Sequence, residues 1–421
     1  MKTLKVGMLG CGNVGSQIAR LLVANKADLA SRAGAQLELV KVAVKDIKAK
    51  RDGIATSLLT DDPYSVVNDP EIDLIIEVIG GISPAKELIL AAFKNGKSVV
   101  TANKALLAKE GAALYQAAGE ANVDLYYEAA VAGAIPILRP LRESLVGDHV
   151  RRIMGIVNGT TNYILTKMDE SGTAFADALK QAQELGFAEA DPTADVEGID
   201  ASDKAAILAG LAFHSRVTDK DVYREGITKI TATDVKVAKA MDMVIKLLAI
   251  TELTASGEIS VRVHPALISR THPLASVRES FNAVFVEAQS AGQMMFYGKG
   301  AGGEPTASAV LGDLVAIARH KISGGIGPKE SDYASLKIAP IGQTKTKYLI
   351  RLNVADKPGV LESVAHVFAA HSVSIQTVRQ TGAGDKAELI VMTHSSTESA
   401  LSATVKDLSN LPAVTDVASV L

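Results

Sequence analysis

The stretch LKVGMLGCGNVG, residues 4–15, decides the fold. It begins as an apolar run and continues as a turn that holds Gly10, Gly12 and Gly15. Apolar residues then recur at helical spacing from Ile18. A strand, a glycine-rich turn and a helix in this order are typical of the first unit of a dinucleotide-binding sheet. We therefore predict an α/β fold that opens with a parallel, Rossmann-type nucleotide-binding domain.

Each glycine of this turn has an expected role. Gly10 permits the tight turn, Gly12 lets the backbone approach a pyrophosphate, and Gly15 lets the helix pack close to the strand. The helix N-terminus adds unpaired N–H groups that favour a phosphate. The candidate cofactor-binding residues of this stretch are Gly10, Gly12, Asn13, Val14 and Gly15. A glycine-rich turn that binds nothing is the alternative interpretation.

Residues 37–44 are predicted as the second strand, whose end selects the cofactor. In such folds an Asp or Glu at this position binds a ribose hydroxyl, and a basic residue accommodates a 2′-phosphate. Here the strand is followed by Lys45, Asp46 and Arg51. Lys45 and Arg51 favour NADP, whereas Asp46 leaves NAD open. A solvated basic loop is an equally simple explanation.

Apolar runs over residues 73–78, 98–100 and 125–128 predict further strands of this sheet. Thr101 and Lys104 follow the second of these runs, at a carboxyl end where open α/β sheets bind ligands. We take both as candidate cofactor-binding residues, and Lys104 also as a substrate-binding residue. A surface lysine without a ligand is the alternative.

An acidic stretch, EADPTADVEGIDASDK, occupies residues 189–204. It contains six carboxylates and a single base, Lys204. Its first half is predicted as loop and its second half as helix, which places Asp200 and Lys204 at i and i+4 on one face. The acids are expected to keep Lys204 protonated, so that it can give a proton to a nascent alkoxide, and to hold a small polar substrate. A solvated loop with an ordinary ion pair explains the stretch equally well.

Three further loops carry candidate ligand groups. After Glu128, residues 129–136 are small and uncharged, so they expose carbonyls that suit a hard monovalent cation, unless they form only a close-packed crossover. Asn158 and Thr160 precede a helix, where they can bind a substrate or cap that helix. Residues 298–305 form a second glycine-rich loop before a predicted helix over 306–320; it is either an anion site, through Gly302 and Gly303, or a hinge.

The last 74 residues, 348–421, alternate between strands and helices in the order βαββαβ. The pattern predicts a separate small domain after a linker over residues 338–346. Its central hairpin is predicted to turn at Gly382-Ala-Gly384-Asp385.

Composition limits the class of protein. The chain has 421 residues, of which 48% are hydrophobic and 22% charged, with a formal net charge of −3. It therefore lacks the basic excess of a nucleic-acid-binding protein and any apolar run of the roughly 18 residues that span a membrane. Cys11 is the single cysteine, as in proteins of the reducing cytoplasm, and His214, His264 and His272 lack zinc-ligand spacing.

Together, these motifs resemble homoserine dehydrogenases that carry a C-terminal ACT domain, over essentially the whole chain. The motifs that carry the resemblance are GCGNVG at 10–15, TANKA at 101–105, EAAVAGAIP at 128–136, NGTTN at 158–162, EADPTADVEG at 189–198 and GAGGEPTASAV at 300–310. The resemblance implies NAD(P)-dependent interconversion of L-homoserine and L-aspartate 4-semialdehyde, in the biosynthesis of threonine, methionine and isoleucine.

The resemblance also implies site residues. Lys204 is the implied proton donor and acceptor, with Asp200 in support. Glu189, Asp195, Thr160 and Lys104 lie where the family binds substrate. A structural Na⁺ is implied at Glu128, Val131, Gly133 and Ile135.

The implied architecture has three domains. They are an NAD(P)-binding domain (1–136), with helix 306–320 packed back on it, a central α+β substrate and dimerisation domain (137–337), and an ACT domain (347–421) that follows a linker (338–346). An amino-acid effector, threonine first, and a homodimer or homotetramer follow from the same resemblance. An ACT domain that only stabilises the oligomer is the alternative.

Two other classes of protein fit this sequence less well. A semialdehyde dehydrogenase that forms an acyl-enzyme needs a thiolate, but Cys11 lies inside the glycine turn. A non-catalytic amino-acid sensor does not need Lys204 with its acidic partners.

Overall fold

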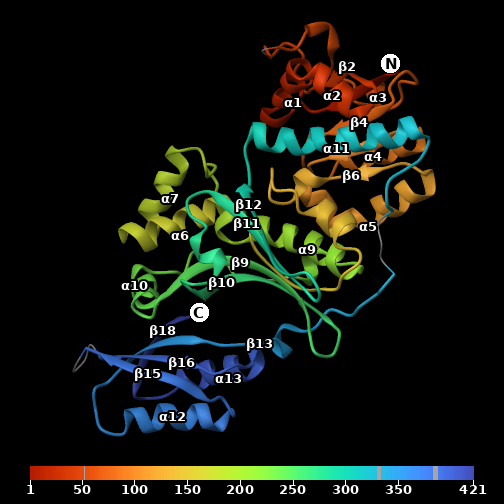
Figure 1. The fold of residues 1–421 in the computed structure, drawn as a ribbon. Coiled ribbons are helices and arrows are strands. Elements are labelled where there is room, and N and C mark those ends of the chain that lie inside the picture. Colours follow the sequence, from red (N-terminus) through yellow and green to blue (C-terminus); the bar gives the residue numbers. More distant parts are fainter. Residues whose placement is uncertain (52, 330–332, 383–386) are drawn as a thin grey trace.

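The computed structural model describes residues 1–51, 53–329, 333–382 and 387–421. It contains a parallel sheet, a mixed sheet and a small antiparallel sheet, which follow one another from one end of the molecule to the other (Figure 1). The predicted α/β fold class is confirmed. No helix in the described ranges is both long and apolar enough to cross a membrane.

The first sheet has six parallel strands in the order β3-β2-β1-β4-β5-β6. Its order reverses between β1 and β4, so the crevice at their carboxyl ends is where such a sheet binds ligands. The strands are β1 (Thr3–Leu9), β2 (Gln36–Ala43), β3 (Leu59–Thr60), β4 (Leu74–Glu77), β5 (Ser98–Thr101) and β6 (Leu125–Tyr126).

Helices cover both faces of this sheet. One face carries α1 (Asn13–Ala24), α2 (Lys26–Ala33) and α11 (Gly303–Ser323); the other carries α3 (Tyr64–Val67), α4 (Ala85–Lys94) and α5 (Lys104–Ala121). Although α11 comes from far along the chain, its Val310 and Leu314 are buried in one cluster with Ile18 and Leu22 of α1 (Figure 1). It begins three residues before the predicted start at Thr306, because a proline is tolerated in the first turn of a helix.

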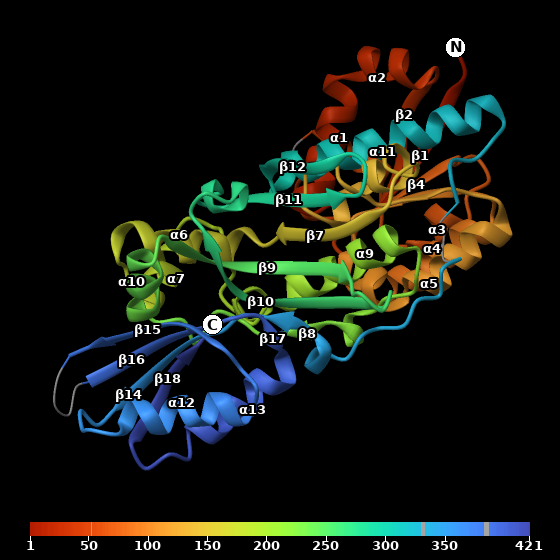
Figure 2. The ribbon, with the colours of Figure 1, turned by 60° about the horizontal axis from the view of Figure 1, so that its bottom comes forward.

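The second sheet is mixed, in the order β12-β11-β7-β9-β10-β8 (Figure 2). Its strands alternate between two apolar clusters; Ile153 of β7 faces the helices and the adjacent Met154 faces the other side. The strands are β7 (Val150–Ile156), β8 (Tyr223–Arg224), β9 (Met243–Leu253), β10 (Ile259–Ser269), β11 (Phe281–Ala288) and β12 (Gly292–Lys299), and the helices are α6 (Gly159–Ser171), α7 (Phe175–Glu184), α8 (Thr193–Val196), α9 (Ile199–Phe213) and α10 (Ala232–Ala240).

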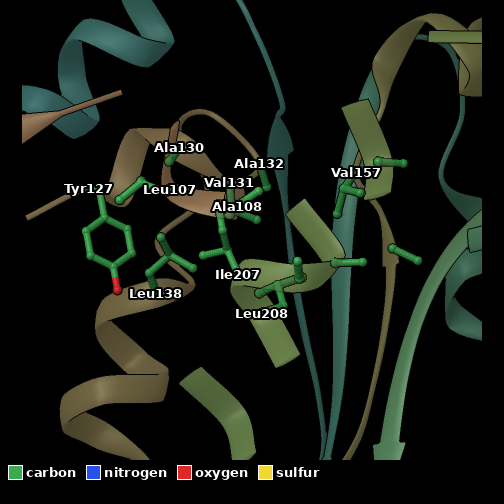
Figure 3. Packing of buried hydrophobic residues seen from close by; sticks show 14 of the residues in the cluster. Leu107, Ala108, Tyr127, Ala130, Val131, Ala132, Leu138, Val157, Ile207 and Leu208 are labelled. Carbon is green, nitrogen blue, oxygen red and sulfur yellow. The ribbon is translucent and has the colours of Figure 1, made fainter. Parts of the chain in front are cut away.

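A single apolar core joins the first two sheets. Leu107 and Ala108 of α5 belong to the same buried cluster as Ile207 and Leu208 of α9. Figure 3 shows these residues beside Leu138 in the segment between the two sheets. The contact between α5 and α9 is therefore the place where the nucleotide-type sheet and the mixed sheet meet.

The third sheet is antiparallel, in the order β15-β16-β14-β18. Helices α12 and α13 lie on its face turned away from the mixed sheet (Figures 1 and 2). The predicted βαββαβ order is confirmed, and its turn at residues 382–385 lies largely outside the described residues. The elements are β14 (Leu349–Val354), α12 (Val360–Ala370), β15 (Ile375–Thr381), β16 (Ala387–Thr393), α13 (Glu398–Leu408) and β18 (Val414–Val420).

The segment that leads to the third sheet follows the edge of the second. Ile259 N–H of β10 donates to the Lys337 carbonyl at 2.8 Å, and Ala339 N–H donates to the Ile259 carbonyl at 2.7 Å. Strand β13 (Lys345–Thr346) then pairs with β17 (Ser396–Thr397). The predicted linker is thus held by backbone hydrogen bonds near both of its ends.

Candidate active site

The glycine turn after β1 leaves room for a ligand. Gly10 has φ +98°, and a Cβ on Gly15 would lie 2.6 Å from the Gly10 carbonyl, so both positions require glycine for the turn itself. In contrast, a Cβ on Gly12 would meet no atom within 4 Å. This open space at the N-terminus of α1 fits the pyrophosphate of a dinucleotide, which the exposed N–H groups favour.

The second glycine loop lies directly against the first. A Cβ on Gly303 would be 2.7 Å from the side-chain oxygen of Asn13, at the start of α1 beside Val14. An ion pair between Arg20, two turns into α1, and Glu304, in the first turn of α11, also joins the two helices. The N-termini of α1 and α11 therefore converge on one place, and Gly302, with φ +120°, turns the chain into α11.

Arg51 reaches from the loop after β2 to this glycine turn. Its guanidinium donates to the carbonyls of Asp46 and Ala49 at 2.8 Å each, and to the Cys11 carbonyl at 3.4 Å. Lys45 is exposed on the same loop. Positive charge is thus held at the end of β2, beside the turn.

Thr101, by contrast, uses its hydroxyl within the chain. It is buried, donates to Glu77 Oε2 at 2.6 Å and accepts from the Asn103 N–H at 3.0 Å. Asn103 in turn caps α5 through the Leu106 N–H at 3.2 Å. Thr101 therefore fixes the turn that presents Lys104.

One carboxylate, Asp200, binds two lysines, one on α5, which packs on the first sheet, and one on α9, which packs on the second. Its Oδ1 lies 2.5 Å from Lys104 Nζ at the start of α5, and its Oδ2 lies 2.7 Å from Lys204 Nζ on α9. Lys204 also donates to the Val157 carbonyl at 2.5 Å. Asp200 and Lys204 are buried, whereas the Lys104 side chain is 43% exposed. The predicted i, i+4 pair is present, and Lys104 joins it.

The two lysines are shifted in opposite directions. Burial lowers the pKa of Lys204, and the attraction of Asp200 offsets this only in part, while Lys104 lowers it further. Burial also acts on Lys104, but Asp200 and the neighbouring acids outweigh it and raise its pKa. The sequence pattern shows the acids around Lys204 but not its burial, which has the larger influence on the pKa of Lys204.

Asn158 connects the lysine cluster to a second carboxylate. Its Oδ1 accepts from the Thr161 N–H at 2.8 Å and so caps α6, while its Nδ2 donates to Asp195 at 2.6 Å and to Asp200 at 3.0 Å. The Thr160 hydroxyl lies 3.0 Å from Asp195 Oδ2 and 2.6 Å from the Phe187 carbonyl. Asn158 thus caps a helix, which is one of the two roles considered for it, and it also positions two acids, which the sequence did not predict.

Glu189 is exposed on the loop after α7. Its carbonyl accepts from the Gln183 side chain at 3.1 Å. In contrast, Asp203 is buried on α9, one residue before Lys204, and burial together with Asp200 and Asp219 raises its pKa to about 6. The sequence shows Asp203 as one acid of the stretch, but its burial follows only from the fold.

The Glu128 carboxylate organises the loop between the first two sheets. It accepts from the N–H groups of Ile137, Leu138 and Arg139 at 2.6, 2.8 and 2.8 Å. These bonds turn the chain out of the sheet, so β6 ends at Tyr126 and not at the predicted Glu128. The Glu128 N–H donates to Asp313 of α11 at 2.7 Å. Burial and Glu128 raise the pKa of Asp313 to about 7.

Residues 131–135 continue this loop as a compact turn. Val131 and Ile135 are buried, and Gly133 has φ +57° and approaches Gly300 so closely that a Cβ would lie 2.4 Å from its carbonyl. Over the described part of the chain, no three His, Cys, Asp or Glu side chains are grouped to hold a metal ion. A cation in this turn would thus depend on Glu128 and backbone carbonyls.

Comparison with known proteins gives matches along the whole chain. The family models are "Homoserine dehydrogenase, NAD binding domain" over residues 10–128, "Homoserine dehydrogenase" over 136–315 and "ACT domain" over 348–413. Homoserine dehydrogenase of Corynebacterium glutamicum is 54% identical over 420 residues, which are 99% of this chain and 94% of that protein.

Two solved structures extend the comparison. A homoserine dehydrogenase from Thiobacillus denitrificans is 40% identical, with a TM-score of 0.94 over 100% of this chain and 97% of that one. A hyperthermophilic archaeal homoserine dehydrogenase in complex with NADPH is 28% identical, with a TM-score of 0.64 over 75% of this chain and 98% of that one. These matches, with Asp200 and its two lysines beside a dinucleotide-type crevice, favour an oxidoreductase over the sensor and thiol-dependent alternatives. The chain belongs to the homoserine dehydrogenase family of NAD(P)-dependent oxidoreductases and carries a C-terminal ACT domain.

Proposed function

We propose that Lys204, held by Asp200, is the proton donor and acceptor in the interconversion of L-homoserine and L-aspartate 4-semialdehyde. The observation that carries this is the pair of bonds from Asp200 to Lys104 and Lys204, at 2.5 and 2.7 Å. The bound nicotinamide cofactor supplies the hydride acceptor or donor. In the oxidative direction neutral Lys204 takes the hydroxyl proton of the substrate, and in the reductive direction its ammonium form returns that proton.

The two lysines are proposed to have different roles. Burial lowers the pKa of Lys204, which makes its neutral form more accessible, whereas the nearby acids raise the pKa of Lys104 and keep it cationic. Lys104 is the partly exposed member of the cluster and is proposed to lie between cofactor and substrate. Glu189, Asp195 and Thr160 are proposed to bind the polar groups of the substrate. Asp195 is supported by its link to Asp200 through Asn158.

Replacing Lys204 with Met tests this assignment. We expect turnover to fall by about 10²- to 10⁴-fold, because the general acid–base group is lost, while cofactor affinity stays within about twofold. The assay follows nicotinamide absorbance with homoserine and with aspartate semialdehyde, and cofactor affinity is measured by fluorescence titration. Lys180→Met, at an exposed position on α7, is the matched control and should keep full turnover. Full turnover in the Lys204 variant would contradict the proposal.

We infer that the cofactor is NADP in preference to NAD. Support comes from Arg51, whose guanidinium bonds to the glycine-turn carbonyl of Cys11, and from exposed Lys45 on the same loop. The related archaeal structure is described as a complex with NADPH. The proposed phosphate-binding residues are Gly10, Gly12, Asn13, Val14, Gly15, Gly302 and Gly303, and Thr101 is proposed to act indirectly, by fixing the turn before Lys104.

Replacing Lys45 and Arg51 together with Ala is expected to raise the KM for NADPH at least tenfold and to change that for NADH by less than threefold. The reason is that the 2′-phosphate, which NADH lacks, loses its charged partners. Lys94→Ala, at an exposed helix end on the same domain, is the control for general loss of charge. Equal loss for both cofactors would show that these bases do not select the 2′-phosphate.

We also propose a structural Na⁺ at the loop formed by Glu128, Val131, Gly133 and Ile135. The donor set is oxygen only, which suits a hard cation. Glu128 already accepts three N–H bonds, so the backbone carbonyls would supply most of the ligands. The test is thermal unfolding in NaCl against choline chloride at equal ionic strength. A rise in Tm with Na⁺ is expected, and identical Tm values would contradict the site.

The third sheet is proposed to regulate the enzyme by binding an amino acid, with threonine as the first effector to test because the reaction lies on the route to it. Such domains commonly place the ligand between two copies, so we propose a homodimer or homotetramer. The domain boundaries 1–136, 137–337, 338–346 and 347–421, with α11 on the first domain, and a cytoplasmic location, belong to the same proposal.

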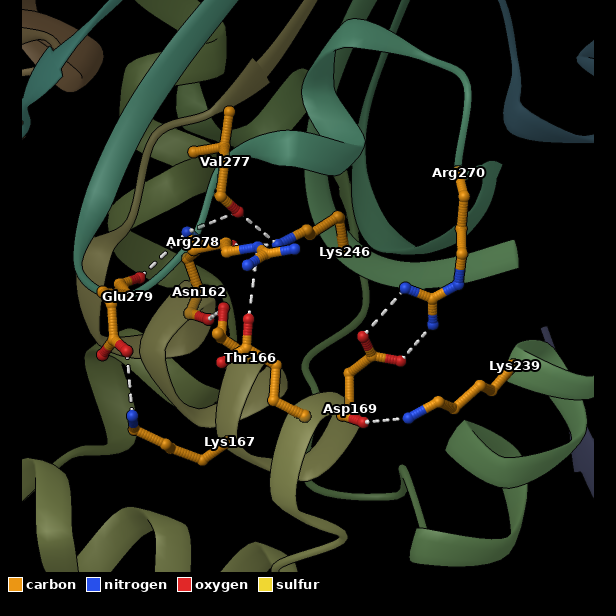
Figure 4. Close-up of polar contacts among 11 residues, drawn as sticks. Asn162, Thr166, Lys167, Asp169, Lys239, Lys246, Arg270, Val277, Arg278 and Glu279 are labelled. Carbon is orange, nitrogen blue, oxygen red and sulfur yellow. Dashed lines mark hydrogen bonds and ion pairs between the residues drawn. The ribbon is translucent and has the colours of Figure 1, made fainter. Parts of the chain in front are cut away.

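A buried ion pair offers a physical route for this regulation. Arg351 of β14 donates to Asp234 of α10 at 2.6 Å, and the Ser419 hydroxyl of β18 donates to the same oxygen at 2.5 Å. At the other end of α10, Lys239 donates to the Asp169 carbonyl at 3.3 Å (Figure 4). Asp169 lies near the end of α6, whose first turn is capped by the site residue Asn158. An effector that prefers one position of the third sheet would thus bias α10 and α6.

Replacing Ser419 with Ala tests this route with little harm to the fold. We expect unchanged turnover without effector and a three- to tenfold change in the half-inhibitory threonine concentration, since one hydrogen bond contributes about 1 kcal/mol. Methionine, isoleucine and lysine would be titrated in parallel. Ser409→Ala, at the end of α13, is the control. The regulatory proposal fails if none of the four amino acids alters turnover, and the route through Asp234 fails if Ser419→Ala responds like the wild type.

A further inference from the structure

A cavity of about 360 Å³ lies between α5 and α9, away from Lys204 and the glycine turns. Residues 215–218 and 326–329 complete its walls. None of the residues to which we assign catalysis or cofactor binding lines it. Its volume is near the lower end of that of typical ligand pockets, which is about 300–1,000 Å³.

The cavity and the active site lie at opposite ends of the contact between α5 and α9. Ala108, Ala112 and Tyr115 line the cavity from α5, and Lys104, one turn before Ala108, lies on the same helix face. On α9 the lining residue Ile207 lies two turns after Asp200, again on the same face.

The N-terminal ends of α5 and α9 are held together by the Lys104–Asp200 ion pair at 2.5 Å. Toward their C-terminal ends the same two faces line the cavity. A molecule that binds more tightly to one spacing of these two helices would therefore also act on the Lys104–Asp200 pair.

The chemistry of the cavity favours a small molecule with one apolar part and one negative charge. Its apolar walls include Leu107, Val123, Ile207 and Leu211. Four basic side chains also line it: Lys109, Arg142, Arg216 and Lys329.

Arg142, one of these basic lining residues, is held in place by two contacts. It donates to the Pro328 carbonyl at 2.9 Å and lies over the Tyr126 ring at 4.9 Å. Among the described lining residues Asp124 is the only acid, and it already binds His320 Nδ1 at 2.9 Å and the Gly327 N–H at 2.7 Å. The lining therefore carries an excess of positive charge, which an anion would complement.

We propose that this cavity is a second ligand site, for an amphipathic anion such as a short acyl or aromatic carboxylate, and that its occupant alters turnover through the Lys104–Asp200 pair. The effect on turnover rests on the proposed roles of Lys104 and Asp200, whereas binding does not. A ligand changes turnover here only if it binds one spacing of α5 and α9 more tightly than the other.

Gly119 allows a sharp test, because it lines the cavity and a Cβ there would meet no atom within 4 Å. Gly119→Leu should therefore fill the cavity without a clash, and leucine is also a better helix former. Gly312→Leu is the matched control, since Gly312 is a helical glycine of α11 with the same open surroundings and lies outside the cavity. Ala112→Leu fills the cavity from the same helix and serves as a second variant if the first fails to fold.

Binding is measured on the full chain with the fluorescent anion 8-anilinonaphthalene-1-sulfonate, and octanoate and octylammonium are the competitors. We expect wild type and Gly312→Leu to bind the probe alike, Gly119→Leu to bind at least tenfold more weakly, and octanoate to displace the probe where octylammonium does not. The site is overturned if both filling variants bind like the wild type, or if the cation competes as well as the anion.

Turnover is then measured with and without octanoate. We expect octanoate to change the turnover of the wild type and of Gly312→Leu by at least twofold, and to leave Gly119→Leu unaffected. An octanoate-binding wild type with unchanged turnover would overturn the coupling to Lys104 and Asp200. Full turnover in the Lys204→Met variant would instead overturn the catalytic assignment of Lys204. Failure of the coupling and failure of the catalytic assignment are therefore distinguishable.

Discussion

The ion cluster around Asp200 is the constraint on which the arrangement of the first two sheets depends. Asp200 is buried on α9 and binds Lys204 of the same helix and Lys104 of α5. Removing one partner from a buried ion pair costs about 3–5 kcal/mol, because an uncompensated charge remains. The cluster therefore ties the start of α5 to α9. The nucleotide-type crevice and the acidic stretch are thereby brought to one place.

The rest of the contact between these sheets continues along α5 and α9. Leu107 of α5 and Ile207 of α9 belong to a single apolar core beside the ion cluster. On the far side of the first sheet, α11 approaches the same junction, where Asp313 accepts the Glu128 N–H. Glu128 in turn fixes the chain as it leaves the first sheet. Buried carboxylates thus secure the junction from both sides, and apolar packing fills the space between them.

Local patterns predicted most strands of the first and third sheets, whereas strands β9 to β12 of the mixed sheet were not predicted individually. The glycine turn at 10–15 and the alternating strands after residue 347 carry their structure in short-range spacing, and both were predicted. Helix α5 was not predicted, because its alanine-rich sequence lacks a clear apolar stripe. The bridging role of Asn158 depends on Asp195 and Asp200, which lie 37 and 42 residues away. Burial of Lys204 likewise follows from packing, which spacing alone does not reveal.

Burial of the cluster is better explained by its effect on the pKa values of the two lysines than by a contribution to the stability of the fold. Apolar residues of similar size often stabilise a core as well as an ion pair does, so buried charges are weak stabilising elements. What burial does provide is a difference between two otherwise equal lysines, since it lowers the pKa of Lys204 while the acids raise that of Lys104. A single carboxylate can produce this difference only if one lysine is enclosed and the other reaches solvent. The side chains of Lys204 and Lys104 are 9% and 43% exposed, so the structure meets that requirement.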